Sequence, residues 1–180
     1  MLPAAGRYYL ASEFTRANGQ DFVQRSEISA TGAASAAATI AEDPTSKTIG
    51  GVRVSLGGAT TLAAGRDARL TFRVEDATTG ALLRNLQPYL GAPAHVVVLS
   101  ADGRQFAHVH GESVGAMPDT RATGGKAGGD GHSDAFAAEG YGPEFAANYT
   151  FATPGLYKIW GQFQSHDGKI ITADYFVRVQ

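Results

Sequence analysis

Residues 94–110 carry the pattern that most restricts how this chain can fold. Two runs rich in β-branched and apolar residues, 95–99 and 106–110, stand on either side of Asp102-Gly103. An Asp-Gly pair between alternating runs is typical of a tight two-residue turn, in which both central residues take positive φ angles. The sequence therefore predicts an antiparallel β-hairpin over this stretch.

The register of this hairpin decides where three of the five histidines lie. With a two-residue turn, His95 is directly opposite His110, and because side chains alternate along a strand, His108 shares their face. Directly opposite residues have Cβ atoms about 4.5–5.5 Å apart, so the three imidazoles would converge. A bulge at Gly103 would shift the register by one residue and move His95 to the other face. The two-residue turn is the prediction that we favour.

The rest of the chain is punctuated at intervals typical of a β-sandwich. Further alternating runs lie at residues 52–56, 69–75, 144–151, 156–163 and 169–179. With the two strands of the hairpin they make seven strands, and no convincing long helix interrupts them. The chain is therefore predicted to be all-β, with an immunoglobulin-like antiparallel two-sheet sandwich over residues 49–180.

Two aromatic residues have expected roles in this sandwich. Tyr157 follows Pro154-Gly155, a place from which sandwich domains often tie a tyrosine hydroxyl to the backbone of the preceding corner. Trp160 is the only tryptophan, and its large ring is expected in the core. Replacing it with alanine should then cost about 3–5 kcal/mol.

Residues 7–28 form a second predicted hairpin, around Asn18-Gly19. It matches the last predicted hairpin at a constant offset of 149 residues, with Gly6, Tyr8, Phe14 and Gly19 against Gly155, Tyr157, Phe163 and Gly168. The match predicts that residues 1–30 are the last hairpin of a preceding similar domain, although two tyrosine-bearing hairpins can also resemble each other by chance. Residues 31–48, rich in Ala, Ser, Thr and Gly, are predicted to be a linker.

Composition and charge exclude several classes of function. Lys and Arg number 15 against 17 Asp and Glu, without a basic stripe, so nucleic acid and anionic membranes are not expected partners. No apolar run approaches the ~20 residues of a membrane span, and residues 1–10 lack an export signal, so the chain as given is expected to be soluble, without membrane insertion. No serine-centred elbow, phosphate loop, dinucleotide fingerprint or HExxH helix is present, so an enzyme is not expected.

The three histidines of the central hairpin are the residues to which chemistry can be assigned. The chain has no cysteine, so nitrogen and oxygen atoms must hold any metal, and neutral imidazole suits Cu(II), Zn(II) and Ni(II). The order of affinities favours copper, with zinc as the alternative. We therefore predict a divalent metal site at His95, His108 and His110, unless these side chains only bond to each other or the backbone and fill the sheet face. Protons compete for the same nitrogen atoms, so binding should weaken in acid.

Three further residues are candidate ligands. Met117 and His132 lie in the Gly-rich stretch 111–142, which is longer than most structureless connections. That stretch could close over the histidines, or it could be a flexible, solvated segment. His166 stands beside the last predicted turn and joins the site only if that hairpin tip lies beside the cluster.

The motifs of the central and last hairpins resemble one family of domains. His95 leads a strand, the return strand reads Phe-Ala-His108-Val-His110, and residues 154–163 read Pro-Gly-Leu-Tyr-Lys-Ile-Trp-Gly-Gln-Phe. Over roughly residues 51–180 the chain is similar to bacterial secreted or periplasmic immunoglobulin-like β-sandwich domains associated with the handling of heavy metals, copper above all. The resemblance implies a periplasmic or secreted metal chaperone, buffer or sensor, with a metal transport protein as its partner.

A second function remains open at this point, a non-enzymatic adhesive or structural β-sandwich module that binds a protein or a glycan. The predicted N-terminal hairpin adds one more partner, because a lone two-stranded hairpin is marginally stable in water. It is therefore expected to pack on the domain of residues 49–180 or, through its unpaired edges, to join a second copy of the chain in a homodimer. Metal content after purification without a His tag distinguishes the metal-binding function from the adhesive one.

Overall fold

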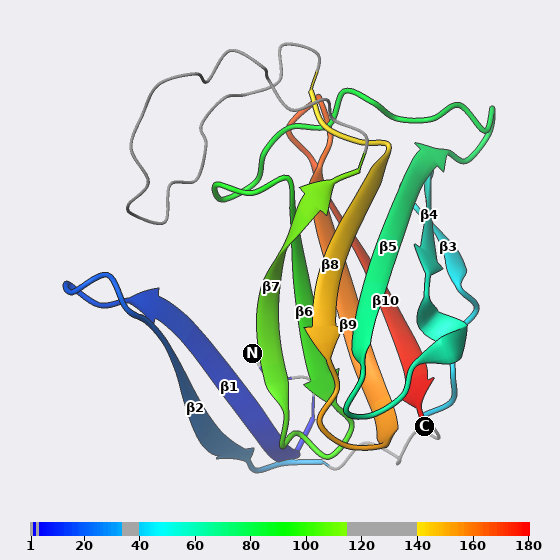
Figure 1. Ribbon diagram of the computed structural model, residues 1–180. Helices are drawn as coiled ribbons and strands as arrows, with labels where there is room; N and C mark the ends of the chain where they lie inside the picture. The colour runs from blue at the N-terminus through cyan, green and yellow to red at the C-terminus, as the bar shows by residue number, and fades with distance from the viewer. Residues whose placement is uncertain (1, 3, 34–39, 115–139) are drawn as a thin grey trace. The chain divides into compact units, whose positions relative to one another are not determined.

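The computed structural model describes residues 2, 4–33, 40–114 and 140–180, and the chain divides into two units, Met1–Ala41 and Glu42–Gln180. Among the described residues every regular element is a strand except one short 3-10 turn (Figure 1). This confirms the predicted all-β class. No helix in the described ranges is long and apolar enough to cross a membrane.

The second unit is built on one antiparallel sheet of eight strands, in the order β10-β9-β6-β7-β8-β5-β4-β3. Its elements are β3 (Ser46–Ile49), β4 (Val52–Gly57), the 3-10 turn η1 (Ala59–Thr61), β5 (Asp67–Asp76), β6 (Ala94–Ser100), β7 (Phe106–Ser113), β8 (Glu144–Thr150), β9 (Gly155–Gln164) and β10 (Ile170–Val179). β7 joins the two halves, because it pairs with β6 over residues 106–111 and with β8 at Glu112 and Ser113. The predicted antiparallel sandwich is thus confirmed, and β7 joins its two halves into one sheet that encloses the core.

The two ends of this strand order, β3 and β10, lie side by side, so the sheet nearly closes. Tyr175 of β10 donates its hydroxyl hydrogen to the carbonyl oxygen of Val54 of β4 over 2.7 Å. Burial raises the pKa of Tyr175 above its ordinary value, so the hydroxyl keeps the proton that it donates. This bond joins the two ends of the sheet across the core.

The sheet begins before residue 49, where the sequence predicts the domain to start. β3 begins within the stretch 31–48, whose composition is that of a linker, and ends at Ile49. Before β3, the N–H of Asp43 donates to the carbonyl oxygen of Phe176 over 2.9 Å, and the Asp43 carboxylate accepts from the Phe176 N–H over 2.8 Å. An edge strand of four residues is too short to show a clear alternation, which explains why its pattern does not stand out in the sequence.

Alternate residues of the strands form the core, as the sequence pattern predicts. Leu70, Phe72 and Val74 of β5 are fully buried, and the Phe72 ring packs edge-on against Phe163 of β9 with centroids 5.7 Å apart. Gly161 of β9 leaves the space that the Phe72 ring fills, because a Cβ atom there would lie 2.7 Å from that ring. The core therefore depends on a glycine in the middle of a strand.

Trp160 lies outside this core, and its expected burial there is wrong. The core-facing residues of β9 include Tyr157, Ile159 and Phe163, so Trp160 points to the opposite face, where it is half-buried. There the Nζ atom of Lys158 lies 5.0 Å from its ring centroid. The strand alternates as predicted, but its phase places the tryptophan on the outer face.

Tyr157 makes the corner bond that the sequence predicts. Its side chain is 1% exposed, and its hydroxyl lies 2.8 Å from the carbonyl oxygen of Thr153 and 2.9 Å from Oε1 of Gln105. The hydroxyl therefore connects the start of β9 to the turn before it and to the β6–β7 turn.

We expect Tyr157→Phe to lower the free energy of unfolding by about 1–2 kcal/mol, because a side chain that is 1% exposed loses the hydrogen bonds of its hydroxyl. Tyr8→Phe is the matched control, since the Tyr8 hydroxyl makes the same bond to Ala4 in a less buried place, and it should cost less than about 0.5 kcal/mol. Chemical denaturation of both variants measures the difference. Equal losses in the two would contradict a structural role specific to Tyr157.

The first unit is a two-stranded hairpin of β1 (Gly6–Thr15) and β2 (Asp21–Ala30), where the sequence predicts one. Both strand bounds and the pairing register recur in β9 and β10 after an offset of 149 residues. The corner bond of Tyr157 recurs too, because the Tyr8 hydroxyl lies 2.7 Å from the carbonyl oxygen of Ala4. The two hairpins have the same backbone plan.

The two hairpins differ in what covers their faces. Ile159 and Phe163 of β9 are fully buried, whereas Leu10 and Phe14, at the same places in β1, are 53% and 48% exposed. On the face of β1–β2 that corresponds to the core face of β9–β10, these two apolar side chains are thus exposed.

Candidate metal centre

The hairpin of β6 and β7 has the register that the sequence predicts. His95 of β6 pairs with His110 of β7, and Val97 pairs with His108. Val96, next to His95, is fully buried in the core, and side chains alternate along a strand. The three imidazoles therefore lie together on the outer face of the sheet.

The turn that sets this register is longer than the predicted two-residue turn. The N–H of Ser100 donates to the carbonyl oxygen of Gln105 over 2.9 Å, which leaves four residues between them. Of the central pair only Gly103 has a positive φ, 71°, while Oδ1 of Asp102 accepts from Ser100 Oγ over 2.6 Å and from the Arg104 N–H over 3.0 Å. These bonds, that of Ser100 first, hold the pKa of the Asp102 carboxyl below its ordinary value. The four-residue loop keeps the same pairs facing each other.

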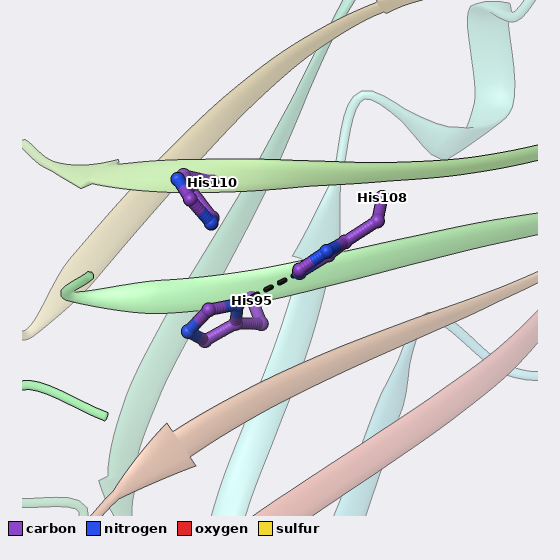
Figure 2. A group of neighbouring side chains, drawn as sticks. All are labelled: His95, His108 and His110. Atoms are coloured by element: carbon purple, nitrogen blue, oxygen red, sulfur yellow. Dashed lines mark hydrogen bonds between the residues drawn. The ribbon is translucent and has the colours of Figure 1, made fainter. Parts of the chain in front are cut away.

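The three imidazoles meet at close range, as Figure 2 shows. Nδ1 of His95 lies 2.7 Å from Nε2 of His108, and one nitrogen from each of the three rings lies within 4.8 Å of the other two. The ring of His110 stands at 85° to both neighbours, with centroids 4.9 Å from His95 and 5.2 Å from His108. Within the described part of the chain, this is the one group of three or more His, Cys, Asp or Glu side chains that lie close enough to share a metal ion.

Burial changes steadily across the cluster. His95 is 4% exposed, His108 is half-buried and His110 is exposed. An ion can therefore approach from the side of His110 and meet the buried nitrogen of His95 without any opening of the core.

A tight turn before β6 holds the other nitrogen of His95. Nε2 of His95 lies 2.6 Å from the carbonyl oxygen of Tyr89, and the Tyr89 ring packs edge-on against the imidazole with centroids 5.5 Å apart. Because a carbonyl oxygen only accepts, Nε2 carries the hydrogen, and Nδ1 of a neutral ring carries the lone pair. Metal-binding histidines usually donate their second N–H to a carbonyl or carboxylate in this way.

Sequence reasoning missed Tyr89, and no local signal points to it. Tyr89 and Ala92 exchange both backbone hydrogen bonds around Leu90 and Gly91, whose φ angles are 48° and 83°. This is a two-residue primed turn, but leucine is rare at positive φ, and the pairs that predict such turns are Asn-Gly or Asp-Gly. Sequence rules for turns therefore do not predict the turn at residues 89–92 that orients His95.

On the other side of β6, the neighbouring strand β9 supplies an amide to the same face. Gln162 pairs with His95, in a row that continues to Thr172 of β10. The Gln162 Nε2 donates to the Thr172 hydroxyl over 3.1 Å, so the orientation of the amide is fixed. The buried side of the histidine cluster is thus bordered by neutral polar groups.

Of the three remaining predicted ligands, two lie outside the described residues, and the third, His166, lies outside the cluster. Met117 and His132 fall within residues 115–139, outside the described residues. His166 is exposed at the tip between β9 and β10, where its carbonyl oxygen accepts from Gln87 Nε2 over 3.2 Å, and its side chain is not part of the described cluster. The described site therefore consists of the three histidines of the β6–β7 hairpin.

One family model matches most of the second unit. It is described as Domain of unknown function (DUF8832), and it matches residues 47–180. No curated protein matches the chain significantly.

Two solved structures align with the chain at low identity. FetP of uropathogenic E. coli strain F11 is 12% identical over 77% of this chain and 94% of its own, with a TM-score of 0.43. The soluble domain of PmoD from Methylocystis sp. ATCC 49242 (Rockwell) is 14% identical over 76% of this chain and 98% of its own, with a TM-score of 0.38. Both scores are too low to support an argument about function, so any function must come from the geometry of the site.

Proposed function

The chain belongs to the family described as Domain of unknown function (DUF8832), and from its histidine site we propose that it is a metal-binding protein. It holds a divalent transition metal, Cu(II) first and Zn(II) second, through His95, His108 and His110. The observation that carries this proposal is the pair of nitrogen atoms 2.7 Å apart, Nδ1 of His95 and Nε2 of His108, with the third imidazole beside them.

Two features favour a metal site over histidines that merely fill the sheet face. The second nitrogen of His95 is bonded to the carbonyl oxygen of Tyr89, which is the outer-shell partner that metal-binding histidines commonly have. The cluster is also accessible to ions through the exposed His110. The bond between the imidazoles of His95 and His108 uses one nitrogen of each of these two rings, whereas a metal ion would use all three rings at once.

The donor set decides the order of the metals. The chain has no cysteine, and imidazole sites bind Cu(II) more tightly than Zn(II) or Ni(II).

The proposed role is non-enzymatic, as a chaperone, buffer or sensor, because an exposed ligand allows a metal to pass to another protein. A periplasmic or secreted location and a metal transport protein as partner complete the proposal, and they rest on the resemblance of the sequence motifs.

We expect metal-free protein without a His tag to bind one Cu(II) per chain, with nitrogen hyperfine lines in its electron paramagnetic resonance spectrum. His95→Ala, His108→Ala and His110→Ala each remove one nitrogen ligand. Each should weaken Cu(II) binding by more than the roughly 10–100-fold that changes in the outer shell cause. Competitive titration with a chelator of known affinity measures the dissociation constants.

His166→Ala is the matched control for this experiment. It removes an exposed imidazole outside the cluster, so Cu(II) affinity and the spectrum should stay unchanged. A wild-type protein that binds neither Cu(II) nor Zn(II) would contradict the proposal and leave the adhesive module as the better function. An equal loss of affinity in His166→Ala would show that copper binds elsewhere.

A further inference from the structure

The turn at residues 89–92 lies against His95, and its strained residue, Leu90, is exposed and does not pack in the sandwich core. We propose that this turn is the positioning element of the metal site. The Tyr89 carbonyl fixes the tautomer of His95, so that Nδ1 of His95 and Nε2 of His108 form a close pair suited to neighbouring positions around a tetragonal ion such as Cu(II). This inference rests on the proposed function and adds to it which atoms bind and which coordination geometry they select.

The turn is held firmly at both of its ends. Before it, the N–H of Gln87 donates to the carbonyl oxygen of Gln164 at the end of β9 over 2.8 Å, and Leu86 is buried in the core. At its end, Ala92 is buried, and one residue, Pro93, separates it from β6. The Tyr89 carbonyl is therefore placed by the same sheet that carries the histidines, and a fixed acceptor orients the His95 ring.

The backbone of the turn is under strain. Leu90 has a φ of 48°, a conformation that residues other than glycine rarely adopt, and its side chain is 76% exposed. The leucine side chain therefore contributes little burial in return. Strained backbone of this kind persists where surrounding structure enforces it, often at functional sites. In this turn the Tyr89 carbonyl oxygen lies 2.6 Å from Nε2 of His95.

The bonds of the metal-free site define what changes when an ion enters. With its hydrogen on Nε2, His95 accepts at Nδ1, so Nε2 of His108 is the donor across the 2.7 Å contact. To bind a metal at Nε2, a neutral His108 must move that hydrogen to Nδ1, a change of tautomer with no net loss of a proton. His108 is half-buried, so water can carry the proton. His95 needs no such change.

The distance between the two nitrogen atoms favours one coordination geometry. Two nitrogens that each lie about 2.0–2.1 Å from one ion are about 2.9 Å apart at a right angle and about 3.3 Å apart at a tetrahedral angle. The 2.7 Å hydrogen bond of the metal-free site is shorter than both values, so the two rings need to move apart less to reach the right-angle arrangement than to reach the tetrahedral one. Right-angle neighbours occur in the tetragonal geometry of Cu(II) and Ni(II), whereas Zn(II) prefers a tetrahedron. The third ligand, on the exposed His110, has the freedom to complete either arrangement.

Two substitutions at one exposed residue test the role of the turn. Leu90→Pro fixes φ near −65°, which is incompatible with the observed 48° and removes the Tyr89 carbonyl from its place. Leu90→Asn is the matched control, because asparagine tolerates positive φ and Asn-Gly is the favoured pair in this turn. Gly91→Ala, which strains the same turn at a φ of 83°, is a milder variant for the case that Leu90→Pro does not fold.

Two readouts separate positioning from folding. Long-range ¹H–¹⁵N correlation spectra of metal-free protein should show His95 with its hydrogen on Nε2 in wild type and Leu90→Asn, and a mixture of tautomers in Leu90→Pro. Cu(II) affinity should fall about 10–100-fold in Leu90→Pro, which is the effect of losing an outer-shell partner. Zn(II) affinity should fall less, so the ratio of Cu(II) affinity to Zn(II) affinity should decrease. Leu90→Asn should keep both affinities within about twofold of wild type.

The outcomes distinguish this inference from the proposed function. If wild type binds Cu(II) but Leu90→Pro binds it equally well with the same His95 tautomer, the metal site stands and the positioning role of the turn is overturned. The role is also overturned if Zn(II) affinity falls as much as Cu(II) affinity, because the turn then selects no geometry. If wild type binds neither metal, the proposed function fails, and this inference fails with it even where the spectra show the expected tautomer.

Discussion

Phe163→Ala is expected to lower the free energy of unfolding of the second unit by about 3–5 kcal/mol. Phe163 is fully buried, and its ring centroid lies 5.7 Å from that of Phe72 and 5.0 Å from that of Phe145. These three rings come from β9, β5 and β8, so they pack two opposed parts of the folded sheet together. Alanine would leave a cavity that the sheet cannot close without moving whole strands. Denaturant unfolding followed by the fluorescence of Trp160 measures the loss.

The chain offers a matched control for this substitution in the other hairpin. Phe14 occupies in β1 the place that Phe163 occupies in β9, but it is 48% exposed. Phe14→Ala should change the stability of the second unit by less than about 0.5 kcal/mol, as exposed substitutions usually do. A loss in Phe14→Ala that matches the loss in Phe163→Ala would show that β1 is buried in solution, against the exposure described above.

Gly161→Val is expected to have a similarly large effect, for the opposite reason. A Cβ atom at Gly161 would lie 2.7 Å from the Phe72 ring and 3.1 Å from the Phe163 ring, closer than packed atoms tolerate. Overpacking of a core usually costs about 1–3 kcal/mol and sometimes more. Valine adds two methyl groups beyond that Cβ, so we expect it to cost at least about 3 kcal/mol and to be worse than alanine.

A double-mutant cycle identifies the clash as the cause. Phe72→Leu replaces the ring that the new Cβ atom would contact with a smaller side chain. Gly161→Ala should therefore lower the free energy of unfolding less in the Phe72→Leu background than in wild type. Residues in direct contact typically show coupling energies of about 0.5–3 kcal/mol. Additive losses would mean that Gly161 is required for its backbone rather than for the space beside Phe72.

The strands and the histidine cluster could be predicted from the sequence because both follow from alternation. The hydrophobic pattern of β5 and β9 places Phe72 and Phe163 in the core, and the pairing of β6 with β7 places His95 opposite His110. The register is as predicted although the turn is not, because the four-residue loop after Ser100 leaves the same pairs facing each other as a two-residue turn would. The predicted pairing of β6 with β7 is therefore correct although the predicted length of their turn is not.

The features that could not be predicted depend on contacts that no local pattern encodes. β3 is too short to alternate visibly, and it is held by its pairing with β4. Trp160 faces outward, and its neighbour Gly161 faces the core. A glycine at a core position has no hydrophobic side chain, so the sequence pattern does not show that residue 161 rather than residue 160 faces inward. The turn that presents the Tyr89 carbonyl to His95 has a leucine at positive φ, which propensity rules count against. In each case tertiary structure overrides the local preference.

The repeat of the last hairpin in the first has a consequence for assembly. Two copies of one element in a chain invite exchange between molecules, in which β1–β2 of one chain takes the place of β9–β10 in another. Here Ser12 would then stand where Gly161 lies, and its Cβ would meet the Phe72 ring at 2.7 Å. Gln24 and Ser26 would replace the buried Ala173 and Tyr175. The polar residues of the first hairpin thus protect the fold against domain swapping, although the two backbones match.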